Sequence, residues 1–164
     1  MILRMRVGVV VGAVLMVSGC RQPDGPVPTP NDNVQEELVD VSRDLQNIAA
    51  GRDPEALQDL AADLSKYAGP TAKPTVEELS RRTASAVAGT ELTEQAAQRL
   101  THNLWLAITA RDISERQIES LQNDTQSLLM SIGVAEDPAH EVALQVGEVQ
   151  RAVTDRPRRW YELF

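Results

Sequence analysis

Apolar residues recur along this chain at steps of three and four positions, a spacing that forms one continuous face only on an α-helix. The first stripe consists of Val34, Leu38, Val41, Leu45 and Ile48, and the second of Leu57, Leu60, Leu64 and Tyr67. Residues able to start a helix interrupt the pattern roughly every 20 positions, at Asn33, Asp53, Thr75, Thr93, Ser114 and Asp137. Because no segment shows sustained strand alternation, the sequence predicts an all-α domain.

Local signals indicate where these helices begin and end. Asp53 and Pro54 fit an N-cap and the first helical position, and the same pair recurs at 137–138. Thr75 and Glu78 have the spacing of a capping box, in which each side chain satisfies a backbone N–H of the other. The glycines expected to end helices are Gly51, Gly69, Gly89 and Gly133.

The segment 93–132 allows two interpretations. A helix capped at Thr93 and continued without a break would place Arg111 and Asp112 on its apolar side. Ser114 and Gln117 form a second possible capping box, so we expect a new helix near Ser114. One long helix with a kink near 110–115 is the alternative.

The connections between these helices are short, so successive helices should lie antiparallel around a shared core. We therefore expect a compact bundle of about six short antiparallel helices, which occupies residues 33–155. Helix pairs that return every ~42 residues also fit the dimensions of an α-solenoid, but equivalent positions carry no repeated signature. The compact bundle is preferred.

The first 19 residues have the three parts of a bacterial export signal. Arg4 and Arg6 precede an apolar stretch, residues 7–17, and small residues follow it. The apolar stretch is too short to cross ~30 Å of hydrocarbon comfortably as a helix. A cleaved signal peptide over residues 1–19 is therefore preferred over a permanent transmembrane helix.

The only cysteine of the chain, Cys20, directly follows this segment. With Val17, Ser18 and Gly19 it forms "VSGC", which resembles the lipobox of bacterial lipoproteins. The resemblance implies that Cys20 is joined to diacylglycerol, that the signal is cut before it and that the new amino terminus is acylated, typically with palmitate. The alternative, a free thiol after an ordinary signal, is disfavoured because an exposed unpaired cysteine is a liability in an oxidising compartment.

A proline-rich segment, residues 20–32, connects this cysteine to the predicted helices. Four prolines within it favour extended polyproline II, so that twelve residues at ~3.1 Å each can span up to ~37 Å. We expect a semi-rigid tether between the lipid surface and the folded part. In Gram-negative lipoproteins an aspartate after the lipidated cysteine commonly signals inner-membrane retention, so the resemblance and Arg21 favour the outer membrane, on its periplasmic face.

The predicted mature chain is acidic. Removal of Arg4 and Arg6 leaves 14 of the 16 basic side chains against 24 acidic ones, a net charge of −10. An anionic domain has no general attraction for nucleic acid, and no basic stripe interleaved with aromatic residues overrides that charge. We expect no nucleic-acid partner.

No residue pattern predicts catalysis, a cofactor or a metal site. His102 is expected to be a half-buried packing residue. His140 lies near Glu136, Asp137 and Glu141, but it has no second histidine at helical spacing, and the acids fit a helix N-terminus equally well. With no nucleophile, orienting partner or glycine-rich loop in sight, we expect a protein that is not an enzyme.

The segment "ISERQIESL", residues 113–121, is similar to the "LTxxQ" helix starts of periplasmic stress proteins such as Spy and CpxP. Ile113 and Ser114 replace leucine and threonine, and Gln117 matches the glutamine. This similarity implies a periplasmic stress sensor or chaperone as an alternative function. The same residues also form an ordinary capping box.

The last residues, 156–164, are unusually basic and aromatic for this chain, and Pro157 should limit the last helix. We expect this tail to fold back and cover an open end of the core, because few other aromatic residues are available to fill it. The alternative is a docking segment for a partner or for the membrane interface. The residues assigned to such a segment are Arg158, Arg159, Trp160, Tyr161 and Phe164.

Taken together, the lipid anchor, the tether and the helices without catalytic residues indicate a membrane-anchored lipoprotein of the bacterial cell envelope. Its expected function is non-catalytic binding of another envelope protein.

Overall fold

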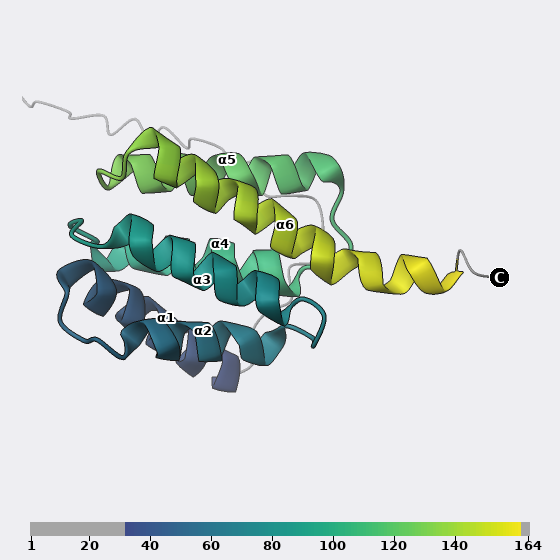
Figure 1. Ribbon diagram of the computed structural model, residues 1–164, viewed down its shortest axis with the longest axis horizontal. Coiled ribbons are helices and arrows are strands. Elements are labelled where there is room, and N and C mark those ends of the chain that lie inside the picture. Colours follow the sequence, from purple (N-terminus) through teal and green to yellow (C-terminus); the bar gives the residue numbers. More distant parts are fainter. Residues whose placement is uncertain (1–31, 162–164) are drawn as a thin grey trace, which may run out of the picture.

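The computed structural model describes the backbone of residues 32–161 and the side chains of residues 34–154 (Figure 1). Every regular element in this part of the chain is an α-helix, which confirms the all-α prediction. The helices are α1 (Asp32–Ala50), α2 (Ala56–Tyr67), α3 (Lys73–Val87), α4 (Glu94–Thr109), α5 (Glu115–Ser131) and α6 (Glu136–Tyr161). Residues 93–132 therefore form two helices, as expected, and not one kinked helix.

The helices pack in two layers of three. One layer contains α2, α3 and α6, and the other contains α1, α4 and α5, which lie behind them in Figure 1. The α1–α2 and α5–α6 pairs bridge the layers at opposite sides of the bundle, and α3 and α4 lie between these pairs. The arrangement is compact, as predicted.

One apolar core fills the space between the two layers. Its fully buried leucines come from α1 to α5 and are Leu45, Leu60, Leu64, Leu79, Leu100, Leu104 and Leu129. Helix α6 contributes the buried valines Val142, Val146, Val149 and Val153. Burial of each such side chain favours folding by roughly 1.5–3 kcal/mol, so the core accounts for most of the drive to fold.

Two predicted helix starts are confirmed in atomic detail. Thr93 accepts a hydrogen bond from the backbone N–H of Ala96 at the start of α4. At the start of α5, Ser114 accepts from the N–H of Gln117, while the Gln117 side chain accepts from the N–H of Ser114 at 2.8 Å. This reciprocal pair is a complete capping box.

The predicted capping box at Thr75 is wrong. Helix α3 begins two residues earlier, at Lys73, because Pro74 fits its first turn, where no N–H is needed. Thr75 therefore lies inside the helix, and Glu78 accepts hydrogen bonds from Arg81 and Arg82 instead. These two arginines lower the pKa of the Glu78 carboxyl below its usual value.

The predicted start of the second helix is also displaced. Helix α2 begins at Ala56, and the Asp53 carboxylate accepts the N–H of Glu55 at 2.9 Å in the turn before it. Asp53 thus organises a local turn and does not cap the helix. Leu57, which we placed in the apolar stripe, is 38% exposed, whereas the adjacent Ala56 is fully buried and takes its place on the buried face of α2.

Not every pair of consecutive helices forms a hairpin. Helices α3 and α4 make no substantial contact with each other, because the connection between them crosses from one layer to the other. Within it, the N–H of Gly89 donates to the carbonyl of Ala49 at 2.9 Å, which ties the end of α3 to the end of α1. Among residues 32–161, no helix combines the length and the apolar character needed to cross a bilayer.

Candidate functional site

The start of α1 and the end of α6 lie at the same end of the bundle, which we call the tether end. Lys66, in the last turn of α2, contacts Glu37 of α1 at 3.0 Å, and the neighbouring Tyr67 ring packs edge-on against Trp105 of α4 at 4.6 Å. The C-terminus of α4 in turn contacts α6, as described next. The predicted tether would therefore join the bundle where α6 leaves it.

Gln150 connects α6 to the C-terminus of α4. Its side chain is fully buried, and its Nε2 donates to the carbonyl of Ala110 at 2.7 Å and to that of Leu106 at 3.4 Å. The carbonyl of Leu106 already accepts the N–H of Ala110 at 3.0 Å, so the main contribution of this amide is to the carbonyl of Ala110, at the end of α4. The Oε1 of Gln150 is buried and has no hydrogen-bond partner among the described residues. The sequence analysis did not identify Gln150. The only feature of the sequence that points to it is the place of this glutamine directly after Val149, in the valine-rich stripe of α6.

Replacement of Gln150 by leucine should lower the free energy of unfolding by about 1 kcal/mol, because the partly buried carbonyl of Ala110 would lose its donor, while removal of the buried Oε1, which has no partner, offsets part of the loss. Chemical denaturation followed by circular dichroism measures this change. Gln98→Leu is the matched control, since Gln98 is exposed on α4, and it should change stability by less than about 0.5 kcal/mol. Equal effects of the two substitutions would contradict this role of Gln150.

The residues predicted to carry the anchor lie outside the part of the chain that the structure describes. These are Val17, Ser18, Gly19 and Cys20, the signal peptide before them and the tether up to residue 31; Phe164 of the tail also lies outside. The backbone of the remaining tail positions, Arg158, Arg159, Trp160 and Tyr161, forms the last turns of α6.

The tail does not fold back over residues 156–161, contrary to our expectation. Helix α6 continues through Pro157 to Tyr161, and its yellow end projects beyond the other helices (Figure 1). A proline removes the hydrogen bond to the carbonyl four residues earlier, here that of Val153. This carbonyl instead accepts from Nη1 of Arg111 at 3.1 Å. Arg111 thus compensates for the bond that Pro157 cannot make.

Truncation after Asp155 should therefore change the free energy of unfolding by less than about 1 kcal/mol. The buried positions described on α6 end at Val153, which the truncated chain keeps. Thermal unfolding followed by circular dichroism compares the two chains. A loss of several kcal/mol would instead show that Trp160 or Tyr161 contributes to the core.

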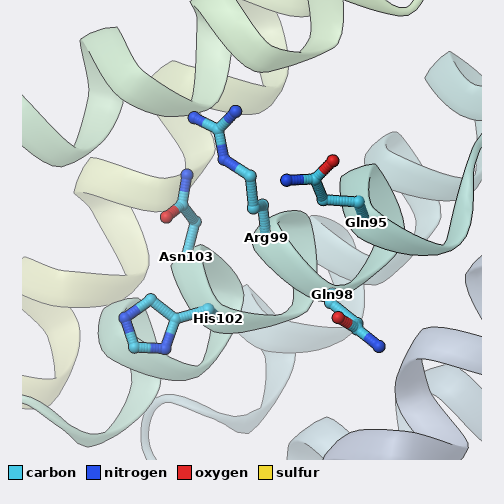
Figure 2. Close-up of a pocket in the computed structure, with 5 residues that line it drawn as sticks. All are labelled: Gln95, Gln98, Arg99, His102 and Asn103. Carbon is cyan, nitrogen blue, oxygen red and sulfur yellow. The ribbon is translucent and has the colours of Figure 1, made fainter. Parts of the chain in front are cut away.

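A polar hollow of about 250 Å³ lies on the outer face of α4 (Figure 2). Its walls are formed by Gln95, Gln98, Arg99, His102 and Asn103, all from this one helix. The side chains of Arg99 and Asn103 extend on the same side of α4, and Asn103 donates to the hydroxyl of Thr125 on α5 at 3.3 Å. His102 is exposed and lines this hollow, so our expectation of a half-buried packing residue is wrong.

His140 lies on the exposed side of α6, and its Nδ1 is 3.4 Å from Oε1 of Gln126 on α5. Within the described residues, no group of three or more histidine, cysteine, aspartate or glutamate side chains is arranged to hold a metal ion.

A cluster of aspartates surrounds Asp44 on α1, on α2 and in the turn between these helices. Partial burial raises the pKa of Asp44 to about 6, and repulsion from neighbouring carboxylates adds to this effect. The carboxylates that surround Asp44 are Asp59, Asp63, Asp40 and Asp53. Lys66 offsets part of the charge through its contact with Asp63 at 2.8 Å.

The raised pKa of Asp44 predicts a dependence of stability on pH. The folded state favours the protonated carboxyl, so ionisation destabilises the fold above about pH 6 and this cost disappears toward the unfolded value of 3.8. Asp44→Asn should therefore raise stability at pH 7 by roughly 1 kcal/mol, after allowance for solvent screening. At pH 4 the variant and the parent chain should be nearly equal.

Denaturant unfolding at pH 7, 5.5 and 4 measures this difference. Asp124→Asn is the control, because Asp124 is an exposed aspartate on α5, outside the cluster. A gain from Asp44→Asn that stayed constant over this pH range would exclude ionisation of Asp44 as its cause.

No family model, curated protein or solved structure matches this chain.

Proposed function

We propose that this chain is a lipid-anchored helical lipoprotein of a bacterial cell envelope that binds another envelope protein and catalyses no reaction. The observation that carries the proposal is the position of the only cysteine, at the end of an apolar export-like segment and within "VSGC". The first described helix begins at Asp32, twelve residues after Cys20, and the proline-rich composition of the residues between them favours an extended tether.

The anchor is tested by growing the source bacterium, or a bacterial host, with an alkyne-tagged fatty acid. The mature protein should carry the label, and its first residue by mass spectrometry should be a diacylated or triacylated Cys20. If the source has two membranes, Arg21 favours recovery with the outer membrane. A mature chain that starts elsewhere and carries no label would overturn the proposal.

The binding function is tested by photo-crosslinking in the native envelope. A photoreactive residue at Gln98 samples the polar hollow on α4, and one at Leu144, which is 48% exposed, samples the outer face of α6. One discrete partner captured from one of these surfaces and not from the other would support a dedicated binding module. If neither position captured a discrete partner, that result would count against a dedicated binding module.

The similarity of residues 113–121 to Spy-like proteins makes a chaperone the second candidate. The structure accounts for Ser114 and Gln117 through their capping box, so these two residues carry no further argument for it. Strong suppression of the aggregation of unrelated unfolded proteins would favour the chaperone over a dedicated partner module.

A further inference from the structure

The C-terminal end of α6 has no neighbouring helix in the bundle. Val153 is its last buried position described, and residues 154–161 continue the helix for ~12 Å at 1.5 Å per residue. Figure 1 shows this end projecting past the other five helices. Trp160 follows Val153 by seven residues, two helical turns, and so continues the register of the apolar stripe.

The composition of this extension differs from that of the rest of the acidic chain. Arg156, Arg158 and Arg159 fall within four residues, and Trp160 and Tyr161 follow them directly. Arginine pairs with phosphate groups, while tryptophan and tyrosine accumulate at the boundary between lipid headgroups and acyl chains. A basic segment followed by aromatic residues is therefore suited to the surface of an anionic bilayer.

Acidic side chains lie at both ends of the bundle. Helices α2, α4 and α6 begin at the end opposite the tether, and their first turns contain Asp59, Glu94, Glu136 and Asp137. Helix α5 begins at the tether end and carries Glu115 in its first turn, as expected because acidic residues favour helix N-termini. Anionic lipid would be repelled by these acidic helix starts and attracted by the arginines of residues 156–159, so the attraction is local to the end of α6.

The tether brings the same end of the bundle to the membrane. Helices α1 and α6 are on opposite sides of the bundle, about 20–25 Å apart for interaxial distances of 8–10 Å. Figure 1 shows the start of α1 set back from the projecting end of α6, and residues 20–31 can span up to ~37 Å when extended. Both attachments can therefore be made at once.

We propose that residues 156–161 of α6 bind the headgroup region of an anionic phospholipid membrane, as a second contact beside the lipid on Cys20. This inference rests on the proposed lipid anchor. The two contacts together hold the bundle end-on, with its opposite end directed away from the bilayer and the outer face of α4 exposed at the side. A tether alone would leave that orientation free.

The test uses residues 21–164, a chain that cannot be lipidated and that keeps every residue of the core, which extends from Val41 to Val153. Binding is measured by co-sedimentation with vesicles of phosphatidylcholine alone or with 30% phosphatidylglycerol, in low and high salt. We expect at least about tenfold stronger partitioning to the anionic vesicles, lost in high salt, since each arginine near such a surface contributes about 1 kcal/mol.

Two triple variants with equal changes in net charge separate a local contact from a general charge effect. Substitution of Arg156, Arg158 and Arg159 by glutamine should weaken binding at least about tenfold. Substitution of Arg43, Arg52 and Arg99 by glutamine, at positions outside the extension, should weaken binding to the anionic vesicles less than about threefold. The fluorescence of Trp160 should shift to the blue on binding, and Trp160→Phe, which leaves the buried Trp105, should abolish that shift.

Equal binding to both kinds of vesicle, equal effects of the two triple variants, or no vesicle binding at all would overturn the inference. Photo-crosslinking from position 161 to a single envelope protein, without vesicle binding, would assign the extension to a protein partner instead. Because this chain lacks Cys20, these outcomes are independent of fatty-acid labelling, which tests the anchor itself.

Discussion

Cys20→Ser should abolish fatty-acid labelling completely. The hydroxyl of serine cannot form the thioether that joins a lipoprotein to diacylglycerol, and the chain has no other cysteine to replace it. Each buried CH₂ of an acyl chain contributes about 0.8 kcal/mol to membrane binding, so two or three chains hold a protein almost permanently. The variant should either fail to mature or remain uncut at the membrane through residues 1–19.

Metabolic labelling, fractionation and the mass of the mature chain measure this effect together. Ser18→Ala is the matched control, because alanine keeps a small residue before the cut and should leave labelling intact. A Cys20→Ser protein that is cut at the same position and still partitions fully with detergent or membrane would contradict the lipid anchor. Membrane contact through α6 alone would be weaker and would depend on salt.

Leu104→Ala should destabilise the fold by about 2–5 kcal/mol. Leu104 is fully buried on α4, the helix that lies between α1 and α5 in its layer and also contacts α6. Truncation of a leucine at such a position loses burial energy and leaves a cavity that neighbouring helices fill only partly. A loss of this size is a large fraction of the 5–15 kcal/mol that stabilises a typical domain.

Leu144→Ala makes the same chemical change at a position that is 48% exposed on α6. It should cost less than about 0.5 kcal/mol, because little apolar surface returns to water and alanine has the higher helix propensity. Denaturant unfolding at constant pH measures both variants. Similar losses of stability from the two substitutions would contradict the burial of Leu104 in the core.

Local chemistry explains which helix ends could be predicted from the sequence. Thr93 and the pair Ser114–Gln117 bond to backbone groups only three residues away, so their caps depend on nothing distant in the chain. The same reasoning failed at Thr75, because Pro74 allows an earlier start and two arginines compete for Glu78. A capping pattern therefore predicts a helix start only where no stronger hydrogen-bond partner engages the capping side chain.

The candidate site was predictable only in part. The basic and aromatic composition of residues 156–161 is plain in the sequence, and so is the position of Cys20. That α1 begins and α6 ends at the same end of the bundle follows from the pairing of helices, which no local pattern specifies. Composition alone left membrane docking of the tail as an alternative, whereas its combination with the tether at one end of the bundle depends on that geometry.

The sequence alone determined the helical class, most of the helix positions and the apolar faces, because periodicity and capping act within a few residues. Tertiary structure decided what depends on contacts between distant segments. Gln150 caps α4 from forty residues away, and Arg111 takes the carbonyl that Pro157 leaves free. Burial, with the neighbouring aspartates as a smaller cause, raises the pKa of Asp44. Each of these effects requires a partner that only packing brings into range.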